Sequence, residues 1–98
     1  MAHFRVSPQA RRDLMEIWKY IAKDSIRHAD LLHERFYAVF SLLGRQPEIG
    51  LDSGEIKQGT RKFPVDNYVI YYRITRRGIQ VIHVFHGKRN QRRAARKQ

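Results

Sequence analysis

Two β-rich runs separated by a short loop constrain the fold of this chain more than any other feature. Residues 68–74 read YVIYYRI and residues 79–85 read IQVIHVF, so both consist largely of β-branched and aromatic residues, which fit a pleated, half-buried surface. The residues between them end in Gly78 and have the length of a hairpin loop. The sequence therefore predicts an antiparallel β-hairpin. Because both faces of residues 68–74 are apolar, we expect part of each face to be covered.

The N-terminal half predicts a short strand followed by two helices. Residues 3–6 alternate, and Ser7 and Pro8 then suit the N-cap and the first position of a helix. Apolar residues recur at helical spacing from residue 8 to about 23, and again from about 26 to 45. The linker between the two helices is too short for anything but an antiparallel helical hairpin.

The remaining segments complete an α+β prediction. Residues 47–59 show turn residues and little periodicity, which predicts an irregular connection. Residues 60–65 read as a short strand, with Pro64 at a place where a ladder donor can be spared. The predicted fold is a short N-terminal strand, an antiparallel helical hairpin and a three-stranded antiparallel meander, with the helices packed on the sheet. A chain of 98 residues forms a single domain, 1–98, with one core.

Basic residues are concentrated at the C-terminus. The formal net charge is +11, and residues 88–98 contain no acid. The basic residues of this tail are Lys88, Arg89, Arg92, Arg93, Arg96 and Lys97. Such a field speeds encounter with an acidic partner, whether nucleic acid, an acidic protein or a nucleoprotein complex. The plainer interpretation is a solvated tail that keeps the protein soluble.

Several chemistries find no support in the sequence. The chain contains no cysteine, which excludes a disulfide framework and a cysteine-ligated zinc site. His28 and His33 diverge on a helix, and His83 and His86 fall on opposite faces of a strand, so we expect no metal. No glycine-rich phosphate loop is present, and we expect no cofactor. No apolar run approaches the length of a membrane span, so no membrane association and a cytoplasmic location are the default expectations.

One catalytic arrangement remains, formed by Arg61, His86 and Arg89 near strand ends. Basic residues there could position a phosphodiester, and a histidine could move a proton. The alternative is that Arg61 pairs with an acid, His86 ends the strand and Arg89 belongs to the solvated tail. Asp13 and Glu16 read as solvated acids at the start of the first helix.

The second helix has a wider apolar arc than one neighbouring surface needs. Leu31, Val39 and Leu42 extend this arc. Either the helix is packed between the first helix and the sheet, or part of it is covered by a partner protein.

The chain resembles the ParE/RelE toxin superfamily in the order and spacing of many weak motifs. These are Ser7-Pro8-Gln9-Ala10, Asp13-Leu14, Ile17, Tyr20-Ile21, Pro47, Gly50, Gly59, Arg61, Tyr68-Val69-Ile70-Tyr71-Tyr72, His86-Gly87 and Arg89. The resemblance implies the strand, helical hairpin and meander predicted above. It also implies a toxin of a type II toxin-antitoxin system with a cognate protein antitoxin, here expected on Leu31, Val39 and Leu42.

The superfamily divides by activity, because RelE-like members cleave mRNA on the ribosome and ParE-like members poison DNA gyrase. Arg61 and Arg89 match the two arginines of the RelE-like pattern, but residues 90–98 contain neither tyrosine nor histidine. His86 could substitute for the missing acid, yet it is also common in the ParE-like branch. The resemblance favours a gyrase inhibitor over an mRNA endoribonuclease, with a non-toxic basic binding module as the third possibility. The target-binding residues are then expected to be Arg61, His86, Arg89, Arg92, Arg93 and Arg96.

Overall fold

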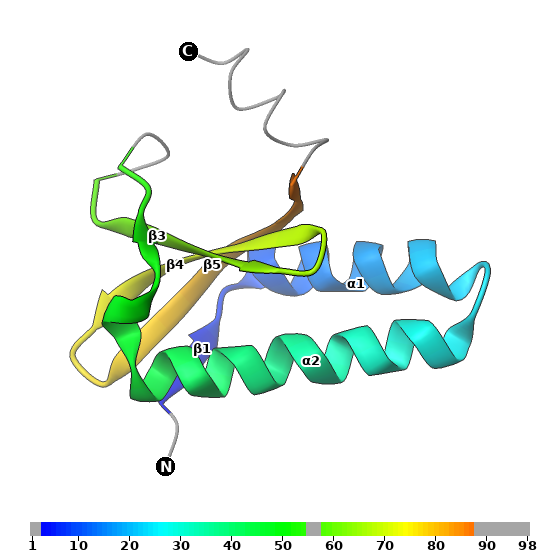
Figure 1. The fold of residues 1–98 in the computed structure, drawn as a ribbon, viewed down its shortest axis with the longest axis horizontal. Helices are drawn as coiled ribbons and strands as arrows, with labels where there is room; N and C mark the ends of the chain where they lie inside the picture. Colours follow the sequence, from blue (N-terminus) through cyan, green and yellow to red (C-terminus); the bar gives the residue numbers. More distant parts are fainter. Residues whose placement is uncertain (1–2, 55–57, 88–98) are drawn as a thin grey trace.

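The predicted β-hairpin lies at the centre of a five-stranded sheet, on which two helices pack (Figure 1). The structure is a computed structural model, and it describes residues 3–54 and 58–87. The elements in chain order are β1 (Phe4–Val6), α1 (Pro8–Ala22), α2 (Ile26–Arg45), the 3-10 turn η1 (Pro47–Ile49), β2 (Leu51–Asp52), β3 (Thr60–Val65), β4 (Tyr68–Thr75) and β5 (Gly78–His86). The predicted α+β class, helical hairpin and meander are confirmed.

The sheet contains one more strand than predicted. Its order is β1-β5-β4-β3-β2, with β1 parallel to β5 and all other neighbours antiparallel. The connection predicted to be irregular contains η1 and β2, and Leu51 of β2 pairs with Lys62 of β3. Two residues show no period, so β2 depends on its partner strand rather than on its own sequence.

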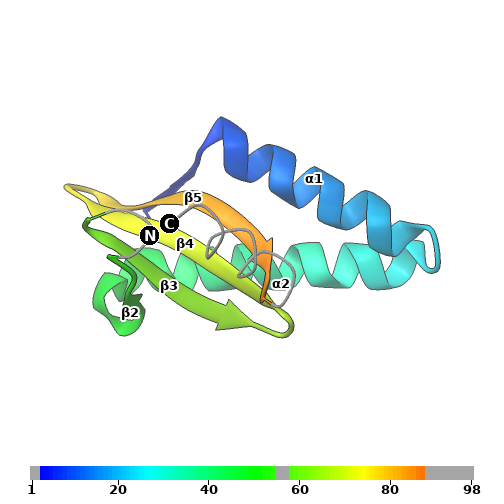
Figure 2. The same ribbon diagram turned by 90° about the horizontal axis from the view of Figure 1, so that it is seen from above.

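Both helices cover one face of the sheet, and the core lies between the two layers. Figure 2 shows the strands in front of α2, with α1 running beside β5. The fully buried core side chains include Phe36, Phe40 and Leu43 of α2, Ala10 of α1, and Ile70, Tyr72, Ile79 and Val81 of the sheet. The alternation of strand residues therefore places one apolar set against the helices.

Capping side chains start both helices. Ser7 Oγ accepts a hydrogen bond from the Ala10 amide (3.0 Å), as predicted for an N-cap. Ser25 Oγ accepts one from the His28 amide (3.1 Å) and so begins α2. In the described part of the chain, neither helix combines the length and apolar character that crossing a membrane requires.

The start of α1 also completes the edge of β5 where β1 has ended. The register between β4 and β5 shifts at Tyr71 and Tyr72, so that β5 bulges locally. Ser7 Oγ donates to the Ile82 carbonyl (3.0 Å), and Asp13 Oδ2 accepts from the Val84 amide (3.0 Å). Asp13 is 8 % exposed. The prediction of a solvated Asp13 is therefore wrong, because its carboxylate takes the place of a neighbouring strand.

Candidate functional site

Arg61 holds the segment that follows α2. Its side chain lies on the helix-facing side of β3, where one terminal nitrogen donates to the Gly50 carbonyl (2.7 Å) and the Glu48 carbonyl (3.3 Å). The alternative prediction was that Arg61 pairs with an acid. Among the described residues, the guanidinium instead contacts these two backbone carbonyls. The guanidinium thus ties the turn η1 and the start of β2 to the sheet.

Tyr72 of β4 also binds the segment that follows α2. It is completely buried, its hydroxyl donates to the Pro47 carbonyl (2.7 Å), and it accepts from the Gly50 amide (3.0 Å). Burial raises the pKa of the Tyr72 hydroxyl, while the hydrogen bond from Gly50 and the charge of Arg61 lower it by a smaller amount. Tyr72 and Arg61 together fix a loop that sequence patterns left without structure.

Tyr72→Phe should lower the free energy of unfolding by about 2 kcal/mol, because it leaves the Gly50 amide without its acceptor. The folded chain has the higher Tyr72 pKa, so this residue's contribution is complete below pH ~10 and is lost as the pH rises further. Urea unfolding at neutral pH and at about pH 10.5 should show a smaller alkaline loss in Tyr72→Phe than in the parent chain. Tyr37→Phe, whose ring packs between Phe4 and Phe40, is the control and should change stability by less than about 0.5 kcal/mol.

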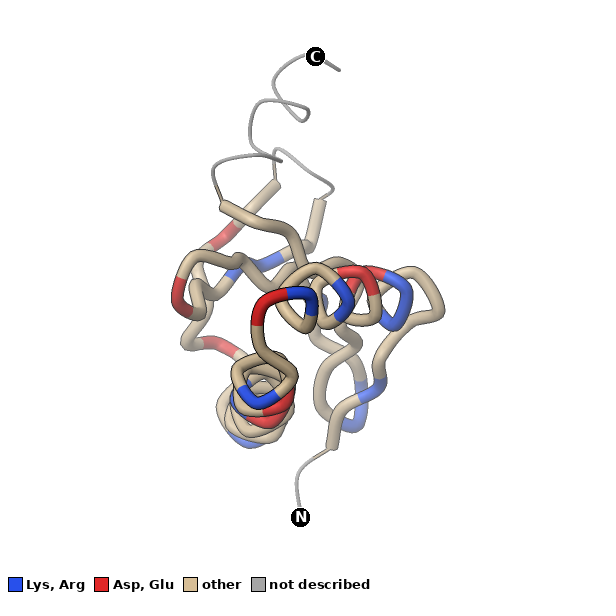
Figure 3. Tube along the Cα trace, turned by 90° about the vertical axis from the view of Figure 1, so that its right-hand side faces the viewer, with Lys and Arg blue, Asp and Glu red and all other residues tan. Residues whose placement is uncertain are grey.

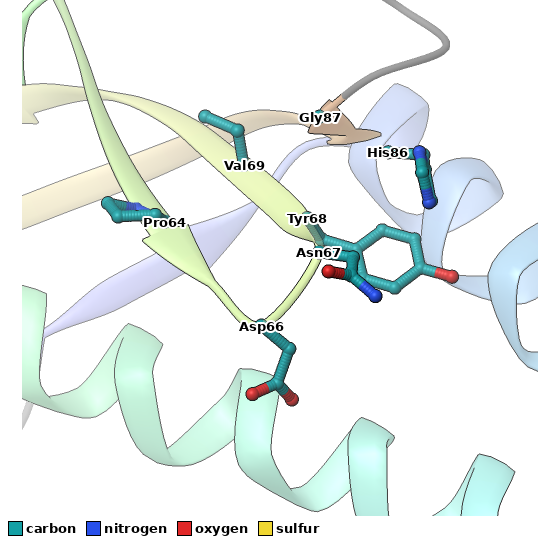
Figure 4. A pocket seen from close by; sticks show the side chains of 7 residues that line it. All are labelled: Pro64, Asp66, Asn67, Tyr68, Val69, His86 and Gly87. Carbon is teal, nitrogen blue, oxygen red and sulfur yellow. The ribbon is translucent and has the colours of Figure 1, made fainter.

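His86 lies at the other end of the sheet, beside an open pocket of about 420 Å³. The residues that line this pocket are Pro64, Asp66, Asn67, Tyr68, Val69, His86 and Gly87 (Figure 4). The ring of His86 packs edge-on against Tyr68, with 5.3 Å between the centroids, and its Nδ1 is buried without a hydrogen-bond partner in residues 3–54 and 58–87. The lining contains no lysine or arginine among the described residues, so it offers no cation for a phosphate.

The structure does not bring Arg61 and His86 together. Arg61 pairs with Tyr72, whereas His86 pairs with Tyr68, four residues away along β4. This offset corresponds to roughly 13 Å along the strand, and both residues face the helix side with core side chains between them. Arg89, Arg92, Arg93 and Arg96 lie outside the described residues, as does the whole predicted tail 88–98.

The three predicted antitoxin-contact residues of α2 differ in environment. Leu31 is 51 % exposed, Leu42 is partly buried, and Val39 is partly buried against the core. The helical hairpin carries further exposed apolar side chains that were not expected at the antitoxin surface, namely Met15, Tyr20 and Ile26. Apolar residues occur around both helices, and the position of the sheet decides which of them are covered.

The far half of the hairpin extends beyond the sheet (Figure 1). The buried residues of α1 are Ala10, Asp13 and Leu14, all in its first half. Near the turn between the helices, Trp18 Nε1 donates to Asp30 Oδ1 (2.9 Å) and so joins α1 to α2. This part of the hairpin is a two-helix layer without a sheet behind it.

The described residues contain no group of three or more potential metal-ligating side chains. Asp13 and His83 do approach each other, with His83 Nδ1 3.3 Å from Asp13 Oδ2. The carboxylate also accepts from Val84 and Gln9, so this arrangement serves the packing of α1 against β5.

Comparison with known proteins identifies relatives over nearly the whole chain. A family model described as the ParE toxin of the parDE type II toxin-antitoxin system matches residues 4–91. Toxin ParE1 of Caulobacter vibrioides is 26% identical over 93 residues, covering 94% of this chain and 96% of that protein.

A solved structure shares the fold. The chromosomal ParDE toxin-antitoxin system from P. aeruginosa contains a chain that superposes with a TM-score of 0.72 at 16% identity, covering 88% of this chain and 96% of that one. The match of the family model to residues 4–91, together with this shared fold, establishes that the chain belongs to the ParE family, the toxins of parDE-type type II toxin-antitoxin systems.

Proposed function

We propose that this toxin inhibits growth by acting on DNA gyrase and that a cognate antitoxin protein neutralises it. The Caulobacter relative is itself named a ParE toxin, and the P. aeruginosa protein is described as part of a ParDE system. These relatives support the pairing of a toxin with an antitoxin. The choice of gyrase follows from the resemblance to the ParE-like branch of the superfamily.

The observation that most favours a binding toxin over a ribonuclease is the separation of Arg61 from His86. A phosphodiester held by Arg61 would be far from any proton moved by His86, since four residues of β4 separate the two levels of the sheet. The guanidinium of Arg61 is also engaged with two loop carbonyls. In this proposal Arg61 contributes indirectly, by holding η1 and β2, while His86, Arg89, Arg92, Arg93 and Arg96 contribute to the target-binding surface.

Purified full-length protein should inhibit gyrase supercoiling or trap gyrase on cleaved DNA. Changing Arg92, Arg93 and Arg96 together to Gln should weaken this inhibition, and the difference from the parent protein should shrink at higher ionic strength, because salt screens the electrostatic attraction that the change removes. Changing Arg11, Arg12 and Lys19 of α1 to Gln removes the same charge elsewhere and should have little effect. Normal gyrase activity combined with cleavage of ribosome-bound mRNA would instead support the endoribonuclease alternative.

The antitoxin in this proposal contacts exposed apolar side chains of the hairpin. Leu31 and Ile26 of α2 and Met15 and Tyr20 of α1 are each more than half exposed. Apolar groups gathered on one element mark a protein-binding surface more often than scattered ones do. Leu42 extends this surface along α2, whereas Val39 supports it from the core side.

Leu31→Glu should weaken the binding of the cognate antitoxin by at least about tenfold, the usual loss when a central apolar contact is replaced by a charge. Stability should change by less than about 0.5 kcal/mol, because the side chain is exposed. Ile49→Glu, a similar change at a 42 % exposed residue outside the hairpin, is the control and should bind normally. Isothermal titration calorimetry measures both, and equal affinities would show that the antitoxin does not use this surface.

A further inference from the structure

The face of the sheet opposite the helices has a composition that the proposed gyrase and antitoxin contacts do not explain. Cross-strand pairing places a common set of side chains there, which we call the outer sheet face. It includes Arg5 of β1, Gln80, His83 and Phe85 of β5, Val69, Tyr71 and Arg73 of β4, Thr60, Lys62 and Pro64 of β3, and Leu51 of β2. In residues 3–54 and 58–87, both helices lie on the other face.

Basic side chains cross this face without an acid among its described members. Arg5 pairs with Gln80 and Gln80 with Arg73, so two arginines flank one glutamine in a row across three strands. Arg73 Nε donates to Gln80 Oε1 (2.8 Å), which orients the guanidinium across the face. Lys62 lies on the neighbouring strand, opposite Tyr71. This part of the face is therefore suited to a row of phosphates.

The helical hairpin differs in its charge pattern. Figure 3 looks onto the turn between α1 and α2 and shows acidic and basic residues on both helices. A polyanion approaching the hairpin would meet both signs, whereas the described members of the outer sheet face include only basic charged side chains, with the buried carboxylate of Asp13 3.3 Å from His83 Nδ1. Of these two surfaces, the outer sheet face is therefore the one that charge favours for a polyanion.

Aromatic rings adjoin the basic row. The ring of His83 stacks on Phe85, with 4.8 Å between centroids and an angle of 20°, and Phe85 lies 5.6 Å from Tyr71. The His83 side chain is 30% exposed, and Phe85 is partly exposed. Flat rings beside cations form the usual platform on which unpaired bases stack, because every base offers a π-face.

We propose that the outer sheet face binds single-stranded nucleic acid, with Arg5, Arg73 and Lys62 on the phosphates and Phe85 and His83 against the bases. An acidic peptide would satisfy the cations but would leave the stacked rings without a partner of their own shape. Duplex DNA presents its bases already stacked and cannot use the rings. This inference concerns direct binding by the toxin and does not depend on gyrase as the target.

Nuclear magnetic resonance with the full-length ¹⁵N-labelled protein tests the location. Titration with a twelve-nucleotide oligothymidylate should shift the amide signals of Lys62, Tyr71, Arg73 and Phe85. A DNA duplex of the same length should bind more weakly and should not shift the amide signal of Phe85. Shifts confined to residues 88–98 or to the hairpin would overturn the proposal, as would equal perturbation of Phe85 by the duplex.

Fluorescence anisotropy with the same labelled oligonucleotide tests the chemistry. The double variant Arg5→Gln/Arg73→Gln should reduce the slope of log affinity against log salt by about 1.4, which is ~0.7 for each lost phosphate contact. The control Arg12→Gln/Lys19→Gln removes the same charge from exposed positions of α1 and should keep the slope. Phe85→Leu should keep the slope but weaken binding about fivefold or more.

Circular dichroism establishes that each variant is folded before its affinity is compared. Equal losses in the two double variants would mean attraction by net charge alone and would overturn the proposal. Unchanged affinity in Phe85→Leu would also overturn it, because the bases would then not stack on this face.

Discussion

Asp13→Ala should lower the free energy of unfolding by about 3 kcal/mol, the cost of removing a charged acceptor and leaving a buried backbone donor unsatisfied. Asp13 Oδ2 accepts from the Val84 amide (3.0 Å) and lies 3.3 Å from His83 Nδ1, and the residue is 8 % exposed. Beyond the end of β1, this carboxylate and the Ser7 hydroxyl pair with the edge of β5. Denaturant unfolding followed by circular dichroism measures the loss.

Two further substitutions separate the role of the acceptor from that of the charge. Asp13→Asn keeps one oxygen that can accept from the Val84 amide. Its loss of stability should therefore be less than half of the loss in Asp13→Ala. Glu16→Ala removes an exposed acid one turn further along α1 and should change stability by less than about 0.5 kcal/mol. A loss in Asp13→Ala no larger than in Glu16→Ala would show that the β5 edge does not depend on this carboxylate.

Asp13 also shows why the sequence predicts the helices well and their contacts poorly. Periodicity predicted helices from 8 to about 23 and from about 26 to 45, and the structure has Pro8–Ala22 and Ile26–Arg45. An aspartate among polar residues near a helix start is ordinarily solvated. Its burial results from its hydrogen bond with the Val84 amide of β5, seventy-one residues away along the chain, and no local sequence pattern predicts such a partner.

Arg61 illustrates the same limit for the candidate site. Its order among the family motifs suggested a catalytic or target-binding cation, but the structure places its guanidinium on the carbonyls of Glu48 and Gly50. Those carbonyls belong to a segment without periodicity, so their position could not be predicted. His86 was correctly expected at the end of the last strand, yet the register of the meander, which separates it from Arg61, emerges only from the pairing of three strands.

Gly78→Ala should destabilise the protein by about 4 kcal/mol, more than any other single change considered for this chain. Gly78 begins β5 with φ +146°, a conformation essentially restricted to glycine. An added Cβ would also overlap the His3 carbonyl oxygen and lie 2.7 Å from the carbonyl carbon. That carbonyl accepts from the Ile79 amide (3.1 Å) at the start of the parallel pairing of β1 with β5, so relief of the overlap would require β1 to move. Strain and displacement each cost roughly 1–3 kcal/mol.

Gly59→Ala separates these two costs. Gly59 also has a positive φ (+85°), but an added Cβ would meet no atom within 4 Å, so only the backbone strain of roughly 1–2 kcal/mol remains. Thermal or urea unfolding should therefore show a much larger loss for Gly78→Ala, together with faster hydrogen exchange at the Ile79 amide, whose acceptor is displaced. Similar losses in the two variants would mean that backbone conformation alone accounts for the glycine and that β1 adapts to a side chain at position 78. The parallel strand would then be a tolerant edge rather than a fixed part of the sheet.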